Sequence, residues 1–485
     1  MLRINDTVNG FSGEFMNLFR YIICCSLLSI SSPFVSEASH LDSNEVLSLK
    51  KAEELALDYN KSLQALRQSA EQGGLRYKQA RARYFPTISF SAFAKETDKG
   101  GAIGYEGSLG SSVRLDQVLF SSSVYHGAKL SELDAQLLFW DLVALENTVL
   151  FDVRTTYFSV LLAQGQVEVQ QQNIDLLVEA SDQELRKQEL GEATLFDVRR
   201  SQVAVANALF EFYRANRELN EAKNRLLNLL GEDAEMFEHL RLVESDISLI
   251  TVPFLTEKLE TLGVRRFREE QEDGVEKIVS GEDAVLIAQQ RTLFSADEMD
   301  YWEDFARKHQ PFIQSSLVQV SRAERALKQK YGAYTPDVGV YGAWTNNDQG
   351  APKSFGEAGV SLSWTLFDSW EREYGVCELK SAVEESKINL KKSQQATEAD
   401  VYDRFFQLEE ALLRYFSADQ SVYLAEEAIE QARNRRSIGV ITPLEYRDAL
   451  QSLTEARQTL NQASFDLLRS YYALWNAVGF SGDTE

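Results

Sequence analysis

Two short stretches of the chain hold acidic residues whose spacing could support chemistry. Glu445 and Asp448 lie three positions apart, and Asp197 stands in a similar stretch 248 positions before Glu445. Carboxylates three positions apart on a helix lie on one face, so together they concentrate negative charge and attract cations. The sequence shows no Ser/His/Asp set, phosphate-binding loop or metal-ligand spacing. It therefore predicts a cation-attracting site, with a plain solvated helix face as the alternative, and neither an enzyme nor a cofactor.

The same two stretches carry the residues of a turn between helices. Gly191 is followed three positions later by Thr194, and Gly439 is followed by Thr442 and then Pro443. Glycine ends a helix because it adopts a left-handed backbone without steric cost. Threonine caps the next helix, and proline fits its first turn because the N–H there has no partner. Each stretch is predicted to be the tip of a helical hairpin.

Matched features on either side of the tips indicate an internal duplication. Their offsets are nearly constant, at 250, 247 and 248 positions, which unrelated helices would not maintain. We therefore predict two structural repeats, over residues 39–231 and 301–480. The matched pairs are Pro86 with Pro336, Phe120 with Phe367, and Gly191 with Gly439.

Helical patterns dominate both repeats. Shorter ones cover residues 46–84 and 301–333, and each ends just before a proline, which pushes the preceding residue towards extended geometry. Longer patterns without proline cover residues 121–190 and 369–437, and each gives about 100 Å at 1.5 Å per residue. The returning helices alternate alanine with larger apolar residues at steps of three and four, as in a coiled-coil seam. No single globular core needs helices of this length.

Between the shorter and the longer helix of each repeat, apolar and polar residues alternate with period two. Each repeat has two such runs, and those of the first repeat have the roughly ten-residue length of a tilted strand in a membrane barrel. A soluble β-hairpin is the alternative interpretation. Trp344 and Trp364 fall at strand positions of the second repeat, where they form either an interfacial aromatic belt or ordinary packing within a soluble sheet.

The composition limits the kinds of molecule that the protein is expected to bind. The 485 residues include 50 basic and 74 acidic side chains, for a formal charge of −24. This balance speaks against nucleic acid, and also against a basic face that docks on anionic lipid. Residues 232–300 have no counterpart in the duplication and are predicted to form an inserted subdomain beside the helices, or a partly disordered linker. Residues 481–485 are a tail.

The first residues resemble a targeting segment. A short apolar core from Tyr21 to Ile30 precedes a small-x-small cleavage site before Ser39, which predicts a signal peptide over residues 1–38. Residues 1–15 are either part of it or an over-long start. An N-terminal membrane anchor is the alternative, although the apolar run is shorter than a spanning helix needs. Removal of this segment leaves Cys377 as the sole cysteine, so no intramolecular disulfide is expected.

One chain does not supply enough predicted strands to form a closed barrel in a membrane. Four strands cannot close a barrel, and lipid does not tolerate an open sheet edge, because its backbone groups would be unsatisfied. Outer-membrane barrels have at least eight strands. Several chains must therefore pool their strands, while the long helices extend away from the membrane. The predicted fold class is an α+β membrane protein built from duplicated long-helix hairpins.

In this duplicated arrangement and in its two Gly-x-x-Thr tips, the chain resembles the TolC-like outer-membrane efflux proteins over about residues 46–480. The resemblance implies a homotrimer whose twelve-stranded barrel lies in the lipid of the bacterial outer membrane, continuous with an α-helical tunnel in the periplasm. It also implies a tripartite efflux or type I secretion system, in which an inner-membrane pump and a periplasmic adaptor deliver small molecules or proteins. A periplasmic coiled-coil scaffold or chaperone without a conduit is the alternative. A diffusion porin is a poorer fit, because it has no need of such helices.

The resemblance also assigns a gate. In that family, acidic side chains just after the second glycine form rings on the threefold axis, which here implies Glu445 and Asp448. Asp197 is the first-repeat equivalent of Glu445, while Arg200 stands where a second acid is expected. The chain departs from the family again at Arg436, where some members carry an aromatic side chain, so the contacts that close the tip are expected to differ.

The tips are further expected to dock the adaptor, because they are the parts of the helices that reach furthest from the membrane. The residues that shape these ends are Gly191, Thr194, Gly439, Thr442 and Pro443.

Overall fold

The computed structural model describes residues 46–98, 105–231, 241–242, 296–347, 354–438 and 440–479. Every structural statement below concerns these residues. The predicted signal peptide and tail, Gly439 and nearly all of the predicted insert lie outside them.

The first repeat contains the predicted hairpin of very long helices. Ser121 caps its first long helix, because the Ser121 hydroxyl accepts a hydrogen bond from the backbone N–H of Val124 at 3.4 Å. That helix then continues without interruption for 68 residues, about 100 Å at 1.5 Å per residue. The elements of this repeat are β1 (Val46–Leu47), α2 (Leu49–Tyr59), α3 (Lys61–Ala82), β2 (Thr87–Asp98), β3 (Tyr105–Phe120), α4 (Ser122–Glu189) and α5 (Leu195–Leu230).

The single helix predicted over residues 46–84 is wrong, because Asn60 divides it into α2 and α3. The Asn60 side-chain oxygen accepts hydrogen bonds from the N–H groups of Ser62 and Leu63, at 3.0 and 3.2 Å, and so caps α3. Its side-chain nitrogen donates to the Leu229 carbonyl at 2.9 Å, near the end of α5. An asparagine side chain competes with the helix for backbone partners, which explains the break at this position.

The second repeat contains the same break. The helix predicted over residues 301–333 is interrupted at Gln310, because the following Pro311 lacks an N–H and disfavours helical geometry before it. Gln310 follows Asn60 by 250 positions, and its side chain donates to the Ala477 carbonyl at 2.9 Å, near the end of the returning helix. The elements are α9 (Ala296–His309), α10 (Pro311–Gly332), β5 (Asp337–Asn347), β6 (Ser354–Ser363), α11 (Glu371–Ser437) and α12 (Pro443–Ala477).

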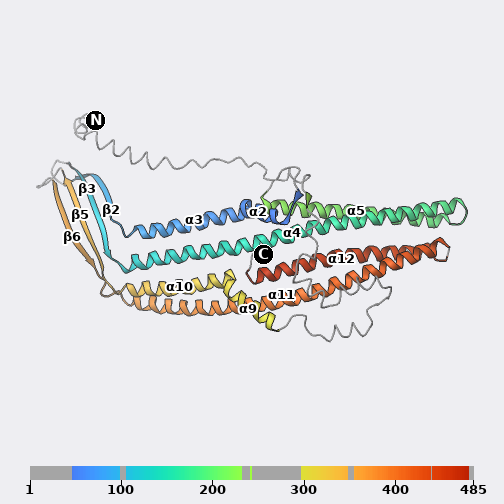
Figure 1. The fold of residues 1–485 in the computed structure, drawn as a ribbon. Coiled ribbons are helices and arrows are strands. Elements are labelled where there is room, and N and C mark those ends of the chain that lie inside the picture. The colour runs from blue at the N-terminus through green and yellow to red at the C-terminus, as the bar shows by residue number, and fades with distance from the viewer. Residues whose placement is uncertain are drawn as a thin grey trace, which may run out of the picture. The chain divides into compact units, whose positions relative to one another are not determined.

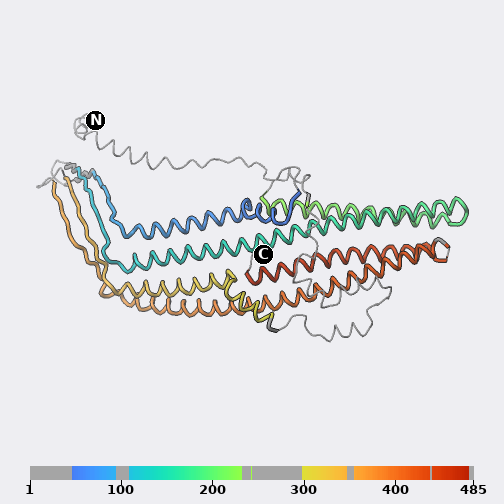
Figure 2. The backbone as a smooth tube through the Cα atoms, viewed as in Figure 1, coloured from blue at the N-terminus to red at the C-terminus, as the bar shows by residue number. Residues whose placement is uncertain are grey.

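Long helices pack side by side within and between the repeats (Figures 1 and 2). The helix α4 pairs with α5, and α11 pairs with α12, while α10 lies against both α4 and α11 and so joins the two repeats. On α5, Ala208, Ala215 and Ala222 are buried at intervals of seven, which confirms the predicted seam of small residues. None of the helices in the described ranges is both long enough and apolar enough to cross a membrane.

Four strands form one antiparallel sheet in the order β2-β3-β5-β6, which confirms the predicted pairs of strands. The two repeats meet at the central pair, β3 with β5, where Val113 lies opposite Trp344. The strands β2 and β6 are the outer members, so each has one edge without a partner strand in the described chain. Cross-strand pairs place Phe90, Val113, Trp344 and Gly356 on one face of the sheet.

An ion pair and a hydrogen bond hold the start of the first repeat against α4. Arg154 forms an ion pair with Glu53, and the Tyr157 hydroxyl donates to the Leu47 carbonyl at 3.0 Å. β1 also pairs in parallel with β4 (Arg241–Leu242), a short strand within the range predicted as an insert. Part of that range therefore lies against the beginning of the helical repeat.

Candidate functional site at the helical tips

The first tip is built from the predicted glycine and threonine. Gly191 follows α4 with a left-handed φ of +77°, and nothing lies within 4 Å of the position where a Cβ would stand. The Thr194 hydroxyl accepts a hydrogen bond from the backbone N–H of Asp197 at 3.2 Å. In return, the Asp197 carboxylate accepts from the backbone N–H of Thr194, also at 3.2 Å. This reciprocal capping box fixes the first turn of α5.

The second tip repeats this geometry in the described residues that follow Gly439. Thr442 caps α12 by accepting from the N–H of Glu445 at 3.3 Å, and the Glu445 carboxylate accepts from the N–H of Thr442 at 2.8 Å. Pro443 occupies the first turn, as predicted. The two tips therefore have the same capping box, once in each repeat.

Two of the three predicted gate acids have a structural function in these caps. Hydrogen bonds from the Thr194 hydroxyl and backbone N–H hold the pKa of Asp197 below its usual value. Glu445 accepts the equivalent bonds from Thr442, whereas Asp448 is exposed and contributes to neither capping box. The Thr-x-x-acid spacing is the signature of a capping box, so the sequence already carried this signal. The gate function of the three acids stays a prediction.

A buried ion pair joins the two repeats next to the tips, and sequence reasoning missed it. The Arg436 guanidinium on α11 lies 2.8 Å from the Glu184 carboxylate on α4, and the two side chains are only 7% and 4% exposed. Arg436 also lies over the Tyr446 ring on α12, 4.3 Å from its centroid. Arg436 on α11 thus contacts two of the other three long helices that meet at the tips, α4 and α12. Its partner is 252 positions away, so no local pattern could identify it.

A groove of about 350 Å³ lies between the two tips. It is lined by residues of α4, α5, α11 and α12, among them Arg200, Arg436 and Arg447. Burial and the nearby charge of Arg200 lower the pKa of Arg447, although Asp448 acts in the opposite direction. The tip region therefore presents basic side chains as well as the predicted acids.

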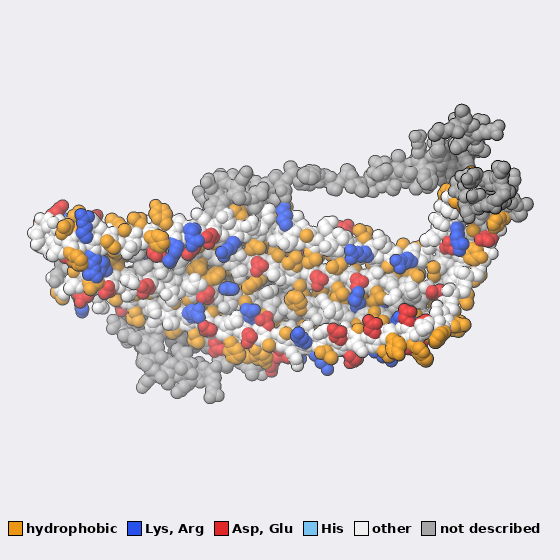
Figure 3. Space-filling view, turned by 180° about the vertical axis from the view of Figure 1, so that it is seen from behind, with side chains coloured by type: hydrophobic (Ala, Val, Ile, Leu, Met, Phe, Trp, Pro, Cys, Tyr) orange, Lys and Arg blue, Asp and Glu red, His pale blue; other side chains and the backbone are white. Residues whose placement is uncertain are grey.

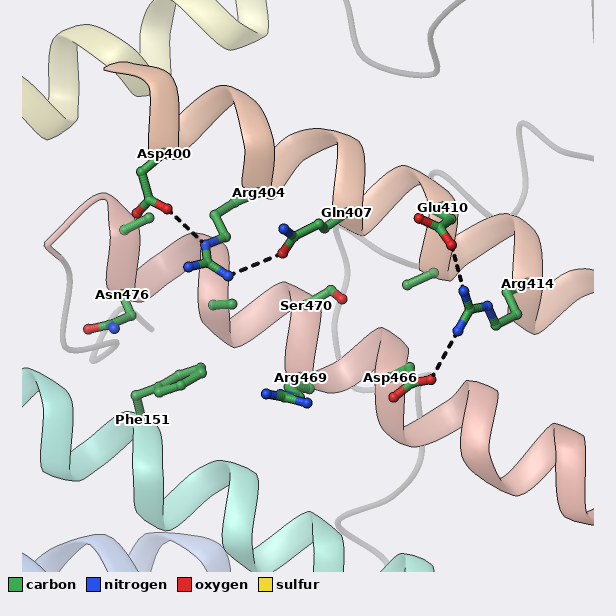
Figure 4. A pocket seen from close by; sticks show the side chains of 13 residues that line it. Phe151, Asp400, Arg404, Gln407, Glu410, Arg414, Asp466, Arg469, Ser470 and Asn476 are labelled. Carbon is green, nitrogen blue, oxygen red and sulfur yellow. Dashed lines mark hydrogen bonds and ion pairs between the residues drawn. The ribbon is translucent and has the colours of Figure 1, made fainter. Parts of the chain in front are cut away.

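A second groove, of about 480 Å³, lies between α11 and α12 and reaches Phe151 on α4 (Figure 4). Its charges are largely paired, since Arg404 contacts Asp400 at 3.1 Å and Arg414 contacts Asp466 at 3.4 Å. Across the residues that the structure describes, no cluster of histidine, cysteine or acidic side chains is arranged to hold a metal ion. This groove has the character of a charged helix surface.

The two predicted belt tryptophans lie at different heights along the sheet. Trp344 is 59% exposed on β5, and its ring covers Gly356 of the neighbouring strand. Trp364 lies one residue beyond the end of β6, so its predicted strand position is wrong by one residue. Its indole N–H donates to the Tyr334 carbonyl at 3.1 Å, which holds the ring beside the junction of sheet and helices. Their function as a membrane belt stays a prediction.

Comparisons with known proteins agree with this architecture. A family model described as outer membrane efflux protein matches residues 53–232 and 304–480. No curated protein matches the chain. Three solved structures have a similar fold at low sequence identity. CusC is 13% identical, with a TM-score of 0.70, and the match covers 92% of this chain and 96% of CusC. VceC of Vibrio cholerae is 14% identical, with a TM-score of 0.68, and the match covers 89% of this chain and 96% of VceC. CmeC of Campylobacter jejuni is 14% identical, with a TM-score of 0.70, and the match covers 93% of this chain and 90% of CmeC.

Proposed function

The chain belongs to the outer membrane efflux protein family, and from this premise we propose that it forms the outer-membrane channel of an export system. It is a transport protein of the bacterial outer membrane, with its long helices in the periplasm. In this proposal three chains assemble, and substrates pass from a periplasmic adaptor and an inner-membrane pump through the helical tunnel to the exterior. VceC is an outer membrane protein and CmeC is an outer membrane channel, which supports this location.

The unpartnered edges of the sheet are the observation on which the proposal mainly rests. β2 and β6 each leave a row of backbone N–H and C=O groups without a strand partner in the described chain. Lipid tolerates no such edge, and only a closed barrel removes it. Pairing β6 of one chain with β2 of the next, three times around, gives twelve strands and no edge. One face is apolar and exposed in the single chain, with Ile88 72%, Val360 71% and Leu362 66% exposed, as expected for contact with lipid.

At the opposite end of the helices, we propose that the tips dock the adaptor and close the tunnel. The ion pair between Arg436 and Glu184 supports closure, because it ties the first hairpin to the second. The rings of Glu445 and Asp448, with Asp197 beside them, would make the mouth favour cations. Because Asp197 and Glu445 also cap helices, their charge would be held at a fixed position in the mouth.

Two measurements on the purified protein test this function. The mass of the protein in mild detergent should correspond to three chains, and the protein should conduct ions when inserted into planar lipid bilayers. A protein that is monomeric and non-conducting would instead favour the coiled-coil scaffold without a conduit. That scaffold has no need of an apolar sheet with two open edges.

A further inference from the structure

The helix ends that adjoin the sheet are basic, although the chain as a whole carries a charge of −24. The expectation from net charge, that the chain has no basic face for anionic lipid, overlooked this local concentration of cations. Between residues 72 and 86, where α3 runs into β2, and between residues 325 and 336, where α10 runs into β5, there is no acidic residue. These two segments nevertheless hold seven cations, which we call the basic collar. They are Arg76, Lys78, Arg81, Arg83, Arg325, Lys328 and Lys330.

None of the seven collar cations forms an ion pair with a carboxylate of the described chain. Cations close by do so: Lys129 lies 2.8 Å from Glu132, Arg322 pairs with Asp134, and Arg372 lies 2.7 Å from Asp368. Further along the helices, acidic and basic side chains are interspersed (Figure 3). Five collar side chains are exposed, and only those of Arg325 and Lys330 are half-buried. The collar therefore presents positive charge that no carboxylate of the described residues neutralises through an ion pair.

Stabilisation of the helix ends accounts for only part of the collar. Cations favour the carboxyl end of a helix, but this effect falls off within the last turn. The last turn of α3 contains one basic residue, Arg81, and that of α10 also contains one, Lys330. Arg76, Lys78 and Lys328 lie further from the helix ends, so the helix dipole does not explain why these positions are basic.

The position of the collar indicates what it binds. α3 ends at Ala82 and β2 begins at Thr87, while α10 ends at Gly332 and β5 begins at Asp337. In a membrane-inserted barrel, these short links lie at the boundary between lipid and periplasm. Tyr84 in the first link is 40% exposed and Tyr334 in the second is 38% exposed, as expected of amphipathic aromatic side chains at that boundary. The cations then face the level of the lipid phosphate groups.

We propose that the basic collar binds the phosphate groups of anionic phospholipids in the periplasmic leaflet of the outer membrane. This inference rests on the proposed function, which sets the depth of the sheet in the bilayer. Lys78 and Lys328 are 250 positions apart and so occupy equivalent places in the two repeats, whereas the other five cations are not matched at this offset. Three chains then present six basic helix ends, and each cation near an anionic surface strengthens binding about fivefold.

Native mass spectrometry of the trimer tests the collar by counting lipids retained from micelles doped with phosphatidylglycerol or phosphatidylcholine. The test variant replaces the exposed Arg76, Lys78, Arg83 and Lys328 by glutamine. A matched control replaces by glutamine four exposed cations that lie outside the last turns of their helices. These control positions are Arg225, Lys391, Lys392 and Arg433.

The wild-type trimer and the control should retain phosphatidylglycerol over phosphatidylcholine, and the collar variant should bind phosphatidylglycerol at least tenfold more weakly. Equal retention of the two lipids by the wild type, or an equal loss in the control, would overturn the inference. Full displacement by millimolar inorganic phosphate would also overturn it, since the collar would then be a site for small oxyanions. Conductance in planar bilayers separates the two proposals. A conducting trimer without lipid preference refutes the collar alone, whereas a non-conducting monomer refutes the channel.

Discussion

The buried ion pair beside the tips gives the sharpest prediction. Replacing Glu184 by glutamine keeps the shape of the side chain but removes its charge, so the Arg436 guanidinium stays desolvated and without its counter-charge. The two side chains are 4% and 7% exposed. Removing one partner of a buried ion pair costs about 3–5 kcal/mol. If the two hairpins separate instead of the protein unfolding, 3 kcal/mol shifts the equilibrium between closed and open tips roughly 100-fold towards open.

Single-channel recording in planar bilayers measures this shift as a larger open fraction and a higher conductance. The matched control is Glu384→Gln, since Glu384 forms an ion pair with Lys387 that is largely exposed, with side chains 68% and 45% exposed. Exposed pairs contribute about 0–1 kcal/mol, so this variant should behave as the wild type. Adding Arg436→Gln to Glu184→Gln removes the unpaired charge and should recover part of the lost closure.

The result that would refute this reasoning is equal conductance for Glu184→Gln and Glu384→Gln, together with equal hydrogen exchange at the tips. The ion pair would then hold the helices together without affecting closure. A second informative result is loss of the trimer in Glu184→Gln. The free energy lost with the ion pair would in that case destabilise the folded subunit as a whole. The hairpins would then be shown not to separate without unfolding.

Three further predictions concern the tips. The double variant Glu445→Gln with Asp448→Asn keeps hydrogen-bond acceptors for the cap but removes charge, so cation preference and block by multivalent cations should both weaken. Unchanged selectivity would identify these acids as a solvated helix face. Gly191→Val places a β-branched residue at φ +77°, a strain of about 1–3 kcal/mol, and should reduce adaptor binding in a pull-down while the trimer persists. Because the pKa of Asp197 is lowered in the folded state, its contribution is present above the unfolded value of 3.8 and is lost as the pH falls through the folded value. The protection factors of the amide hydrogens in the first turn of α5, which correct for the pH dependence of intrinsic exchange, should therefore stay constant from pH 7 to 5. A loss of protection near pH 6 would contradict this assignment.

Local rules predicted much of the fold from sequence. The prolines before each hairpin, the glycine after α4 and the threonine caps act within a few residues, so the register of the two repeats could be read from Pro86, Pro336 and Gly191. The breaks at Asn60 and Gln310 were missed although the Asn60 cap and Pro311 are local signals. The hydrogen bonds from Asn60 and Gln310 to carbonyls 169 and 167 positions away could not be read from any local pattern.

The candidate site was predicted less completely than the fold, partly because a local signal was overlooked and partly because one contact is long-range. Acids near the tips were identified by type and spacing, but the capping function of Asp197 and Glu445 was overlooked in favour of their charge. Arg436 was recognised only as a departure from the family pattern. Its importance depends on Glu184, which resembles any other surface carboxylate until the hairpins are packed together.

The open edges of the sheet have a consequence for biogenesis. The second repeat must be synthesised before β3 can pair with β5, and β2 and β6 then still have one free edge each among the described residues. In the proposed trimer the final pairing step involves other chains, so the folding yield should rise with subunit concentration, and stability is inseparable from assembly. Until a subunit meets its neighbours, its exposed strand edges can also pair wrongly with other extended segments. A cell that makes this protein is expected to keep the unassembled chain at low concentration or shielded by a chaperone, and to couple insertion into the membrane with trimer formation.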